Sequence, residues 1–195
     1  AAQFINRPKS CIAFVLDKGG VFGTFIGTPE AAWEGASALS AKKHIIYKGR
    51  TYDRALAVLP DMYDELWVGG KGMYKLEPVI ADGGEVIIYA PHLERISLSH
   101  GALIKQVGYH VRDYFLKQWD RFKHMPLSVL AHSTHVKGLG KFDAETREEH
   151  PRIQVTLATG ISADTCREIN LGYMDPETIR LEDWEGREAE GILLV

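Results

Sequence analysis

Short apolar runs alternate with segments of helical character along this chain. The apolar runs, rich in β-branched and aromatic residues, lie at 11–16, 21–26, 66–68, 86–90 and 153–158. Helical patterns follow at 71–81, where Pro78 would kink or split the helix, and at 97–122, with a break at Gly108. The alternation predicts an α/β fold: a Rossmann-like parallel or mixed sheet with helices on both faces, plus an N-terminal β-hairpin.

The first 45 residues combine a hairpin with a helix. The runs 11–16 and 21–26 flank Asp17-Lys18-Gly19-Gly20, whose glycines suit a tight turn. Thr28 is predicted as the N-cap of the next helix and Pro29 as its first residue. This helix should end near residues 42–44, where cations favour a C-terminus.

Other segments are less distinct in pattern. Residues 45–58 are ambiguous, 127–136 fit either strand or helix, and 137–151 are predicted as a charged loop. Ser162 should cap a helix that runs to about residue 170, with Gly172 as the left-handed residue that ends it.

The glycine-rich segment around Lys71 is the leading candidate for chemistry. We predict that the run Leu66–Val68 is a strand that leads into the turn 69–72 and a helix, with 86–90 as the next strand of a βαβ unit. Ligands of open α/β sheets bind at the carboxyl edge of the strands, and a lysine there suits a carboxylate or phosphate. Gly70 or Gly72 is expected to adopt a positive φ. The alternative is a tight turn with a solvated Lys71.

Several further polar side chains follow the predicted strand 86–90. They are His92, His100, Tyr109 and His110. If their loops fold over the crevice beside Lys71, these groups converge on one pocket. The alternative is that each histidine caps a helix or lies on the surface.

His132 and His135 have a spacing found in some metal sites. On a helix these positions share a face, and on a strand they point apart. No cysteine or carboxylate nearby completes a recognisable ligand set, so no metal site is predicted, and local hydrogen bonding is the expected use of both histidines. The glycines at 69, 70 and 72 lack the spacing of a dinucleotide fingerprint.

Composition and charge exclude several classes of protein. The chain has 195 residues and a formal net charge of −3, with both signs interspersed and no basic stripe, so nucleic acid is not an expected partner. No apolar run approaches ~20 residues and no signal peptide is recognisable, so neither a membrane nor secretion is expected. Cys11 and Cys166 lie far apart and are expected as reduced thiols of a cytoplasmic protein. A homo-oligomer is compatible with the sequence.

The ends of the chain suggest a fragment of a larger protein. The sequence begins Ala1-Ala2-Gln3 and ends in an apolar stretch, 191–195. We expect one α/β domain over 1–195, in which residues 1–45 lead from a missing N-terminal domain and 60–195 form a Rossmann-like core. A processed or tagged complete protein is the alternative.

Two motifs and their spacing carry a family resemblance. Residues 11–41 hold the hairpin, the segment Gly27-Thr-Pro-Glu-Ala-Ala-Trp-Glu-Gly35 and an alanine-rich helix. Lys71-Gly-Met73 is followed, after nine residues, by Gly83-Gly84. This order resembles the C-terminal part of the lactate racemase family, the nickel-pincer-nucleotide 2-hydroxyacid racemases and epimerases. The resemblance is specific over roughly the first 90 residues and weak beyond them.

The resemblance implies a division of labour between two domains. In that family an N-terminal domain carries the nickel ligands, the lysine joined to the cofactor and two acid/base histidines. The C-terminal domain closes over it and contributes a lysine that contacts the substrate, which Lys71 matches by position. The family often has Tyr-Gln shortly before this lysine, where this chain has Trp67-Val68, so the substrate contacts should differ. No part of this chain resembles the nickel-binding half, so we expect no cofactor and no activity in this chain alone.

The implied reaction removes a hydride from C2 of a small 2-hydroxy acid onto the pincer pyridinium and returns it to either face. Lys71 would hold the substrate carboxylate, and the enzyme's own N-terminal catalytic domain would be the partner. The residues expected near substrate or cofactor are Trp67, Gly69, Gly70, Gly72, His92, His100, Tyr109 and His110. Two alternatives remain: a stand-alone α/β domain that binds a small anion without catalysis, and a non-catalytic interaction domain.

Overall fold

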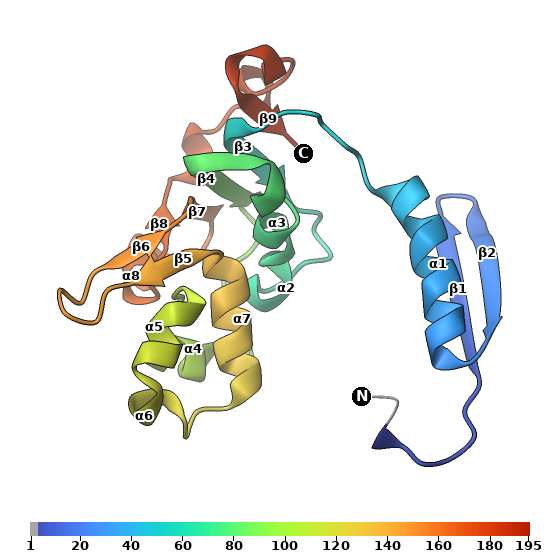
Figure 1. Cartoon of the computed structure of the whole chain (residues 1–195). Coiled ribbons are helices and arrows are strands. Elements are labelled where there is room, and N and C mark those ends of the chain that lie inside the picture. Colours follow the sequence, from blue (N-terminus) through green and yellow to red (C-terminus); the bar gives the residue numbers. More distant parts are fainter. Residues whose placement is uncertain (1–3) are drawn as a thin grey trace. The chain divides into compact units, whose positions relative to one another are not determined.

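The computed structural model describes residues 4–195 and divides them into two compact units, which separate between Gly49 and Arg50 (Figure 1). Residues 1–3, on which the fragment hypothesis drew, lie outside the described part. Within that part no helix is long and apolar enough to cross a membrane. Cys11 and Cys166 are free thiols, and burial raises the pKa of Cys166 to about 11.

The N-terminal unit is the predicted hairpin and helix. Strands β1 (Cys11–Asp17) and β2 (Gly20–Gly27) pair antiparallel, and helix α1 runs over Pro29–His44. The side chain of Thr28 accepts a hydrogen bond from the Ala31 N–H at 3.2 Å, which confirms the predicted cap. The hairpin also exposes apolar side chains on β1 and β2, including Ile12, Phe14 and Ile26.

The second unit is built on a five-stranded parallel sheet, which confirms the predicted fold class. Its strands are β3 (Tyr52–Val58), β4 (Ile80–Ala90), β7 (Gln154–Thr159), β8 (Gly172–Tyr173) and β9 (Ile192–Leu194). The order across the sheet is β8-β7-β4-β3-β9, and every neighbouring pair is parallel.

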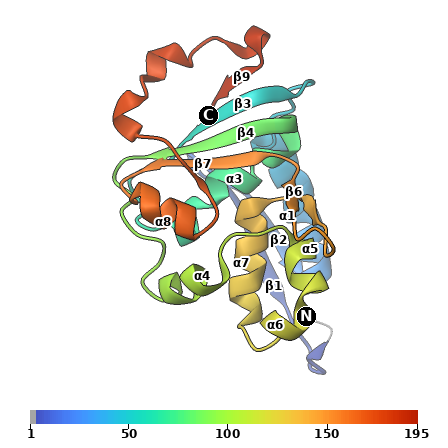
Figure 2. The same ribbon diagram turned by 90° about the vertical axis from the view of Figure 1, so that its left-hand side faces the viewer.

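Both faces of this sheet are covered, as the alternation of its side chains requires. Val86 and Ile88 of β4 belong to the large core, which also contains Met73 and Val136. Ile87 points to the other face, where it packs in a smaller cluster with side chains of the C-terminal segment such as Trp184. Helices α3 and α7 accordingly lie on one side of the sheet and the C-terminal segment on the other (Figure 2).

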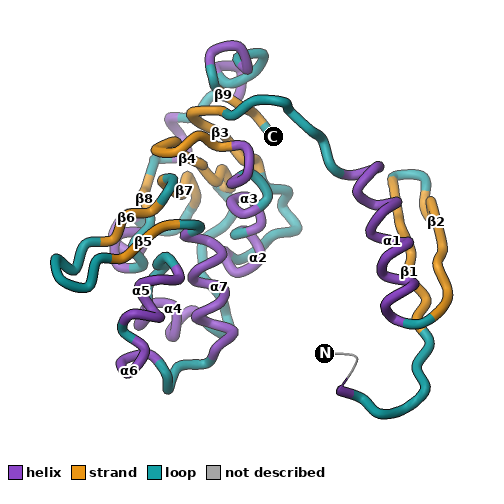
Figure 3. The backbone as a smooth tube through the Cα atoms, viewed as in Figure 1, coloured by secondary structure: helices purple, strands orange, loops and turns teal. Residues whose placement is uncertain are grey.

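The remaining elements connect these strands, and their order along the backbone can be followed in Figure 3. The helices are α2 (Leu66–Gly69), α3 (Lys71–Tyr74), α4 (Gly101–Val107), α5 (Arg112–Lys117), α6 (Trp119–Phe122), α7 (Leu127–Lys137) and α8 (Ala163–Glu168). Short 3₁₀ turns are η2 (Glu77–Val79), η3 (Pro176–Thr178), η4 (Leu181–Asp183) and η5 (Glu188–Glu190). A second hairpin consists of β5 (Gly140–Phe142) and β6 (Glu149–Pro151).

The strand predicted at Leu66–Val68 is wrong, because these residues begin helix α2. The strand that precedes β4 along the chain and pairs with it is β3, which lies in the stretch 45–58 that the sequence left ambiguous. A three-residue apolar run is too short to show a period, so tertiary contacts decide its conformation. The predicted helix over 71–81 is also shorter: α3 ends at Tyr74, η2 follows, and β4 begins at Ile80.

Three other expectations are corrected or settled. The stretch 97–122 forms three helices, with a break at Gly108 (φ 72°) as predicted. Residues 127–136 are helical, and the predicted loop 137–151 contains the hairpin β5–β6. Ser162 caps α8 as predicted, but the left-handed residue after that helix is Asn170 (φ 61°), and Gly172 is extended in β8.

The predicted positive φ at Gly70 or Gly72 is wrong. Gly70 is helical, with φ −53°, and neither Gly69 nor Gly72 has a positive φ. These glycines serve close packing instead, since a Cβ on Gly70 would lie 2.6 Å from Cγ2 of Val136 on α7. The absence of a side chain lets the α2–α3 junction approach α7.

Replacement of Gly70 by alanine should therefore destabilise the protein by about 1–3 kcal/mol, because the added methyl group overpacks this contact. Gly101→Ala is the matched control: its Cβ would lie 3.9 Å from the nearest atom, Cβ of Ile96, at the start of α4. Alanine there should be neutral or stabilise by up to about 1 kcal/mol. Urea unfolding of both variants tests this, and equal effects would contradict it.

Candidate functional site

Lys71 is the first residue of α3 and carries an unpaired charge. Its ammonium nitrogen lies 5.4 Å from the ring centroid of Tyr63. Within residues 4–195 no carboxylate lies close enough to Lys71 for an ion pair. A half-buried cation without a protein partner is available to an anionic ligand.

A groove of about 580 Å³ opens beside this lysine, between the α2–α3 segment and α7. We call it the Lys71 groove; it is lined by Trp67, Val68, Lys71, Tyr74, Ser128, Ala131, His132 and His135. Lys71 also borders a smaller pocket of about 160 Å³, which it shares with Val58 and Pro60 at the end of β3. The lysine thus adjoins the carboxyl end of a parallel strand, where α/β sheets bind ligands. That strand is β3, and not the strand predicted at Leu66–Val68.

Trp67 and His132 form a rigid wall of this groove. Their rings stack with centroids 3.9 Å apart and planes 7° apart, and His100 packs on Trp67 at 4.2 Å. The Nε2 of His132 lies 2.9 Å from the carbonyl oxygen of Trp67. Since a carbonyl only accepts, this nitrogen must carry the proton, and the contact fixes the orientation of the imidazole.

The surroundings of His132 favour its neutral form. Burial lowers the pKa of His132, and the charges of His135 and His100 act in the same direction, against the Trp67 carbonyl and the Glu65 carboxylate. Its Nδ1 is buried and has no hydrogen-bond partner within the described chain, and the same holds for the hydroxyl of Tyr109. A proton on Nδ1 would therefore be poorly stabilised.

This environment predicts a pH dependence of stability. Because the pKa of His132 is lower in the folded state than its ordinary value of about 6.5, the unfolded chain binds the proton more readily below that pH. The contribution of His132 to the free energy of unfolding should therefore decrease as the pH falls from about 7 towards the pKa that His132 has in the folded state. The stability advantage of the wild type over His132→Gln, whose amide can still donate to the Trp67 carbonyl, should shrink from pH 7.5 to pH 5.5. Urea unfolding at both pH values measures this, and a constant or growing difference would argue against it.

Trp67 and the predicted glycines lie beside Lys71, but of the predicted residues at 92–110 only His100 comes near the groove. His100 reaches the groove indirectly, through its contact with Trp67. His92 contacts the Tyr63 carbonyl at 3.1 Å and Asp61 at 3.4 Å, and it does not line the groove. The prediction that Lys71 and the loops within 92–110 share one crevice is therefore wrong. The loop that carries His110 contacts Glu149 on the β5–β6 hairpin instead.

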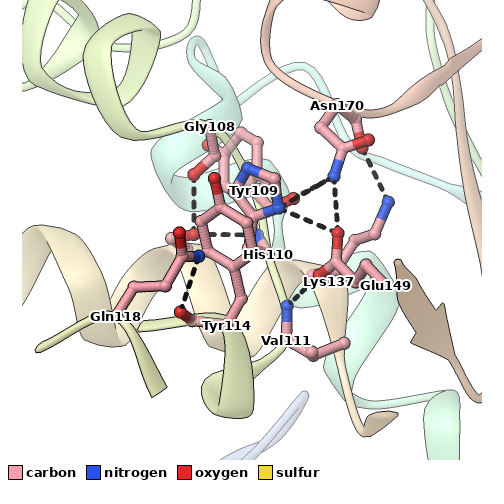
Figure 4. Close-up of polar contacts among 10 residues, drawn as sticks. Gly108, Tyr109, His110, Val111, Tyr114, Gln118, Lys137, Glu149 and Asn170 are labelled. Carbon is pink, nitrogen blue, oxygen red and sulfur yellow. Dashed lines mark hydrogen bonds and ion pairs between the residues drawn. The ribbon is translucent and has the colours of Figure 1, made fainter. Parts of the chain in front are cut away.

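Tyr109 and His110 belong instead to a buried polar network (Figure 4). Tyr109 is fully buried, and burial together with the Glu65 carboxylate raises its pKa. The Nδ1 of His110 lies 2.8 Å from a carboxylate oxygen of Glu149, and its ring stacks on Tyr114 at 3.7 Å. This network joins α5 to β6.

Glu149 is the centre of this network. It accepts from the backbone N–H of Val111 at 2.5 Å and from Nδ2 of Asn170 at 2.9 Å. Burial raises the pKa of Glu149, but the hydrogen bonds from His110 and Val111 and the charges of His110 and Lys137 outweigh it, so the pKa is lowered. Burial lowers the pKa of Lys137, whose ammonium donates to the Asn170 carbonyl at 2.7 Å. His110, Glu149, Asn170 and Lys137 all have hydrogen-bond partners inside the protein, which is typical of a structural network, whereas the Tyr109 hydroxyl has none within the described chain.

The three predicted glycines also have a packing role. Gly69 and Gly70 are buried, and a Cβ on Gly69 would lie 2.9 Å from Leu93 Cδ1. Gly72 is buried as well and borders the smaller pocket. No ligand-facing turn forms here, because the segment is helical.

Sequence reasoning missed half of the groove. Tyr74, Ser128 and Ala131 were not singled out, and only metal binding and local hydrogen bonding were considered for His132 and His135. Their i, i+3 spacing on a helix was the usable signal, since α7 presents both to the groove. Among the described residues no group of three or more His, Cys, Asp or Glu could hold a metal ion.

The arrangement can bind and orient a small anion. Lys71 supplies the charge, and the Trp67–His132 stack supplies a fixed aromatic surface next to it. None of the residues lining the groove is acidic. Such a site can fix a carboxylate at one end and an apolar group at the other.

Comparison with known proteins places the chain beside two solved structures. A crystal structure of a Thermotoga maritima protein from a structural genomics consortium is 37% identical, with a TM-score of 0.82 over 94% of this chain and 45% of its own. The structure of the lactate racemase apoprotein from Thermoanaerobacterium thermosaccharolyticum is 15% identical, with a TM-score of 0.63 over 95% of this chain and 43% of its own. This chain therefore spans less than half the length of either protein. No family model and no curated protein matches.

Proposed function

We propose that this chain is the C-terminal, substrate-closing part of an isomerase, a racemase or epimerase of 2-hydroxy acids. The observation that carries the proposal is that Lys71 lines a groove without a carboxylate and has no ion-pair partner among residues 4–195. The likeness of its fold to the lactate racemase apoprotein and the resemblance of the Lys71 segment to that family support it.

The chemistry of the substrate explains why such a cation matters. Inversion at C2 requires that hydrogen leave one face and return to the other, so the carboxylate must stay fixed while the carbon becomes planar. Lys71 would hold that carboxylate by a charge-assisted hydrogen bond. Val136 packs against Gly70, which fixes the helical turn on which Lys71 stands.

The resemblance implies a nickel-pincer nucleotide, and residues 4–195 form no group of three or more His, Cys, Asp or Glu that could hold its metal ion. Under the proposal the cofactor is held by a part of the longer protein outside this chain. The role of this chain is then limited to its own side chains: Lys71 binds the carboxylate, and the Trp67–His132 wall limits the space around the substrate.

A direct experiment is to incubate the longer protein that contains this sequence with an enantiopure 2-hydroxy acid. Chiral chromatography should detect the opposite enantiomer. The 195-residue chain alone should bind the acid without converting it. Absence of interconversion for lactate, aryl and sugar 2-hydroxy acids alike would overturn the proposal.

The alternative, a domain that binds an anion without catalysis, makes a different prediction. Lys71-dependent binding would then occur while the longer protein leaves every enantiomer unchanged. Binding and turnover are measured independently, so the two experiments distinguish a racemase or epimerase from a domain that only binds an anion.

A further inference from the structure

The lining of the Lys71 groove limits the side chain that a substrate can carry. Lys71 is the only formally charged residue of the lining apart from the two titratable histidines. Tyr74 is 38% exposed, and Val68 and Ala131 add further apolar surface. A half-buried cation next to aromatic and aliphatic surface suits an acid with an apolar tail.

The size of the groove also exceeds what a three-carbon acid can fill. Its volume of about 580 Å³ falls within the ~300–1,000 Å³ typical of sites that enclose larger ligands. Lactate, held by Lys71, would leave most of this space to water. A larger side chain would displace that water from apolar surface, which favours binding.

The aromatic wall is already rigid. Trp67 is fixed between His132 and His100, and His132 is held by the Trp67 carbonyl. A surface ordered before binding costs little conformational entropy when a ring packs against it.

The groove offers few partners to a polyhydroxylated acid. The Nε2 of His132 already contacts the Trp67 carbonyl, and its Nδ1 is buried. The other polar groups of the lining are the Ser128 and Tyr74 hydroxyls, the His135 ring and the indole N–H of Trp67. Several sugar hydroxyls would therefore lose water without replacement, which is unfavourable.

We propose that the Lys71 groove selects 2-hydroxy acids with an aromatic side chain over lactate and over sugar acids. The inference rests on the proposed function for the hydroxy acid. The preference for a ring comes from the groove itself. Tyr74 and Trp67 would contact the ring, while Lys71 holds the carboxylate.

Binding to the 195-residue chain tests this proposal with four probes: 3-phenyllactate, lactate, gluconate and 2-phenylethanol. NMR titration gives each dissociation constant from the indole N–H signal of Trp67, which is identified as the cross-peak lost in Trp67→Phe. Phenyllactate should bind at least about tenfold more tightly than lactate, gluconate no more tightly than lactate, and phenylethanol, which lacks the carboxylate, more weakly than phenyllactate.

Two variants distinguish the contribution of the Lys71 charge from that of contacts with the aromatic ring of the ligand. Lys71→Met should weaken phenyllactate at least about tenfold. Tyr74→Ala, at an exposed position, should weaken phenyllactate binding more than lactate binding and so reduce the preference for phenyllactate.

Equal Lys71-dependent affinities for lactate and phenyllactate, or tighter binding of gluconate, would overturn the aromatic preference and leave the proposed function standing. If no probe bound in a Lys71-dependent manner, the carboxylate site itself would be wrong, and both proposals would fail. Phenyllactate binding that survives Lys71→Met unchanged would likewise reject the assigned site.

Discussion

Replacement of Glu149 by alanine should lower the free energy of unfolding by about 2–4 kcal/mol, because several donors lose a charged acceptor and one hydrogen bond to a charged group contributes about 1.5–3 kcal/mol. The carboxylate accepts from His110 at 2.8 Å, from Val111 N–H at 2.5 Å and from Asn170 at 2.9 Å. Its removal deprives the His110 and Val111 donors of this acceptor in a partly buried space, whereas Asn170 keeps the Tyr109 carbonyl and Lys137 keeps the Asn170 carbonyl. Urea unfolding at pH 7 measures the loss.

The adjacent residue provides the control. Glu148 is 68% exposed and lies 3.8 Å from His150, so Glu148→Ala should change the free energy of unfolding by less than about 0.5 kcal/mol. Glu149→Gln keeps the size and one acceptor and should lie between the two. Equal small effects of Glu148→Ala and Glu149→Ala would show that the network contributes little to stability.

Replacement of Lys71 by methionine should reduce kcat/KM of the longer protein for its 2-hydroxy acid by about 10- to 150-fold. The reason is the loss of a charge-assisted hydrogen bond to the substrate carboxylate, worth about 1.5–3 kcal/mol. Stability should barely change, since Lys71 has no ion-pair partner to lose within residues 4–195. Steady-state kinetics with each enantiomer measures the effect.

Lys141→Met is the matched control, because Lys141 is exposed and lines neither the Lys71 groove nor the smaller pocket. Its loss removes the same charge and should change kcat/KM less than about twofold. A similar reduction in both variants would indicate a general effect of charge, and full activity of Lys71→Met would remove the substrate contact from the account.

Local signals explain which parts of the fold the sequence predicts well. Thr28 and Ser162 cap helices through bonds to residues three positions later, and such bonds depend on neighbouring sequence alone. The apolar alternation at 153–158 likewise marks β7 correctly. By contrast, β3 carries Asp53 and Arg54, and these charged residues interrupt the apolar pattern by which a strand inside a sheet would be recognised.

Contacts between distant residues explain what the sequence could not show. Arg54 is accommodated in β3 because it pairs with Glu85 on β4 at 3.1 Å. His110 and Glu149 are 39 positions apart, and their pairing depends on how the β5–β6 hairpin reaches α5. The sequence predicted only part of the candidate site. The glycines and Lys71 were identified from their local pattern, whereas Tyr74 lines the groove because α3 packs beside α7, which the sequence does not show.

The most direct test of the proposed function follows the hydrogen on C2. The longer protein is incubated in ordinary water with an enantiopure 2-hydroxy acid that carries deuterium at C2, and the opposite enantiomer is analysed by chiral chromatography and mass spectrometry. Removal and return of the same hydrogen predicts that the product enantiomer retains its deuterium. Replacement of the deuterium by solvent hydrogen, or no formation of the opposite enantiomer, would contradict the proposal.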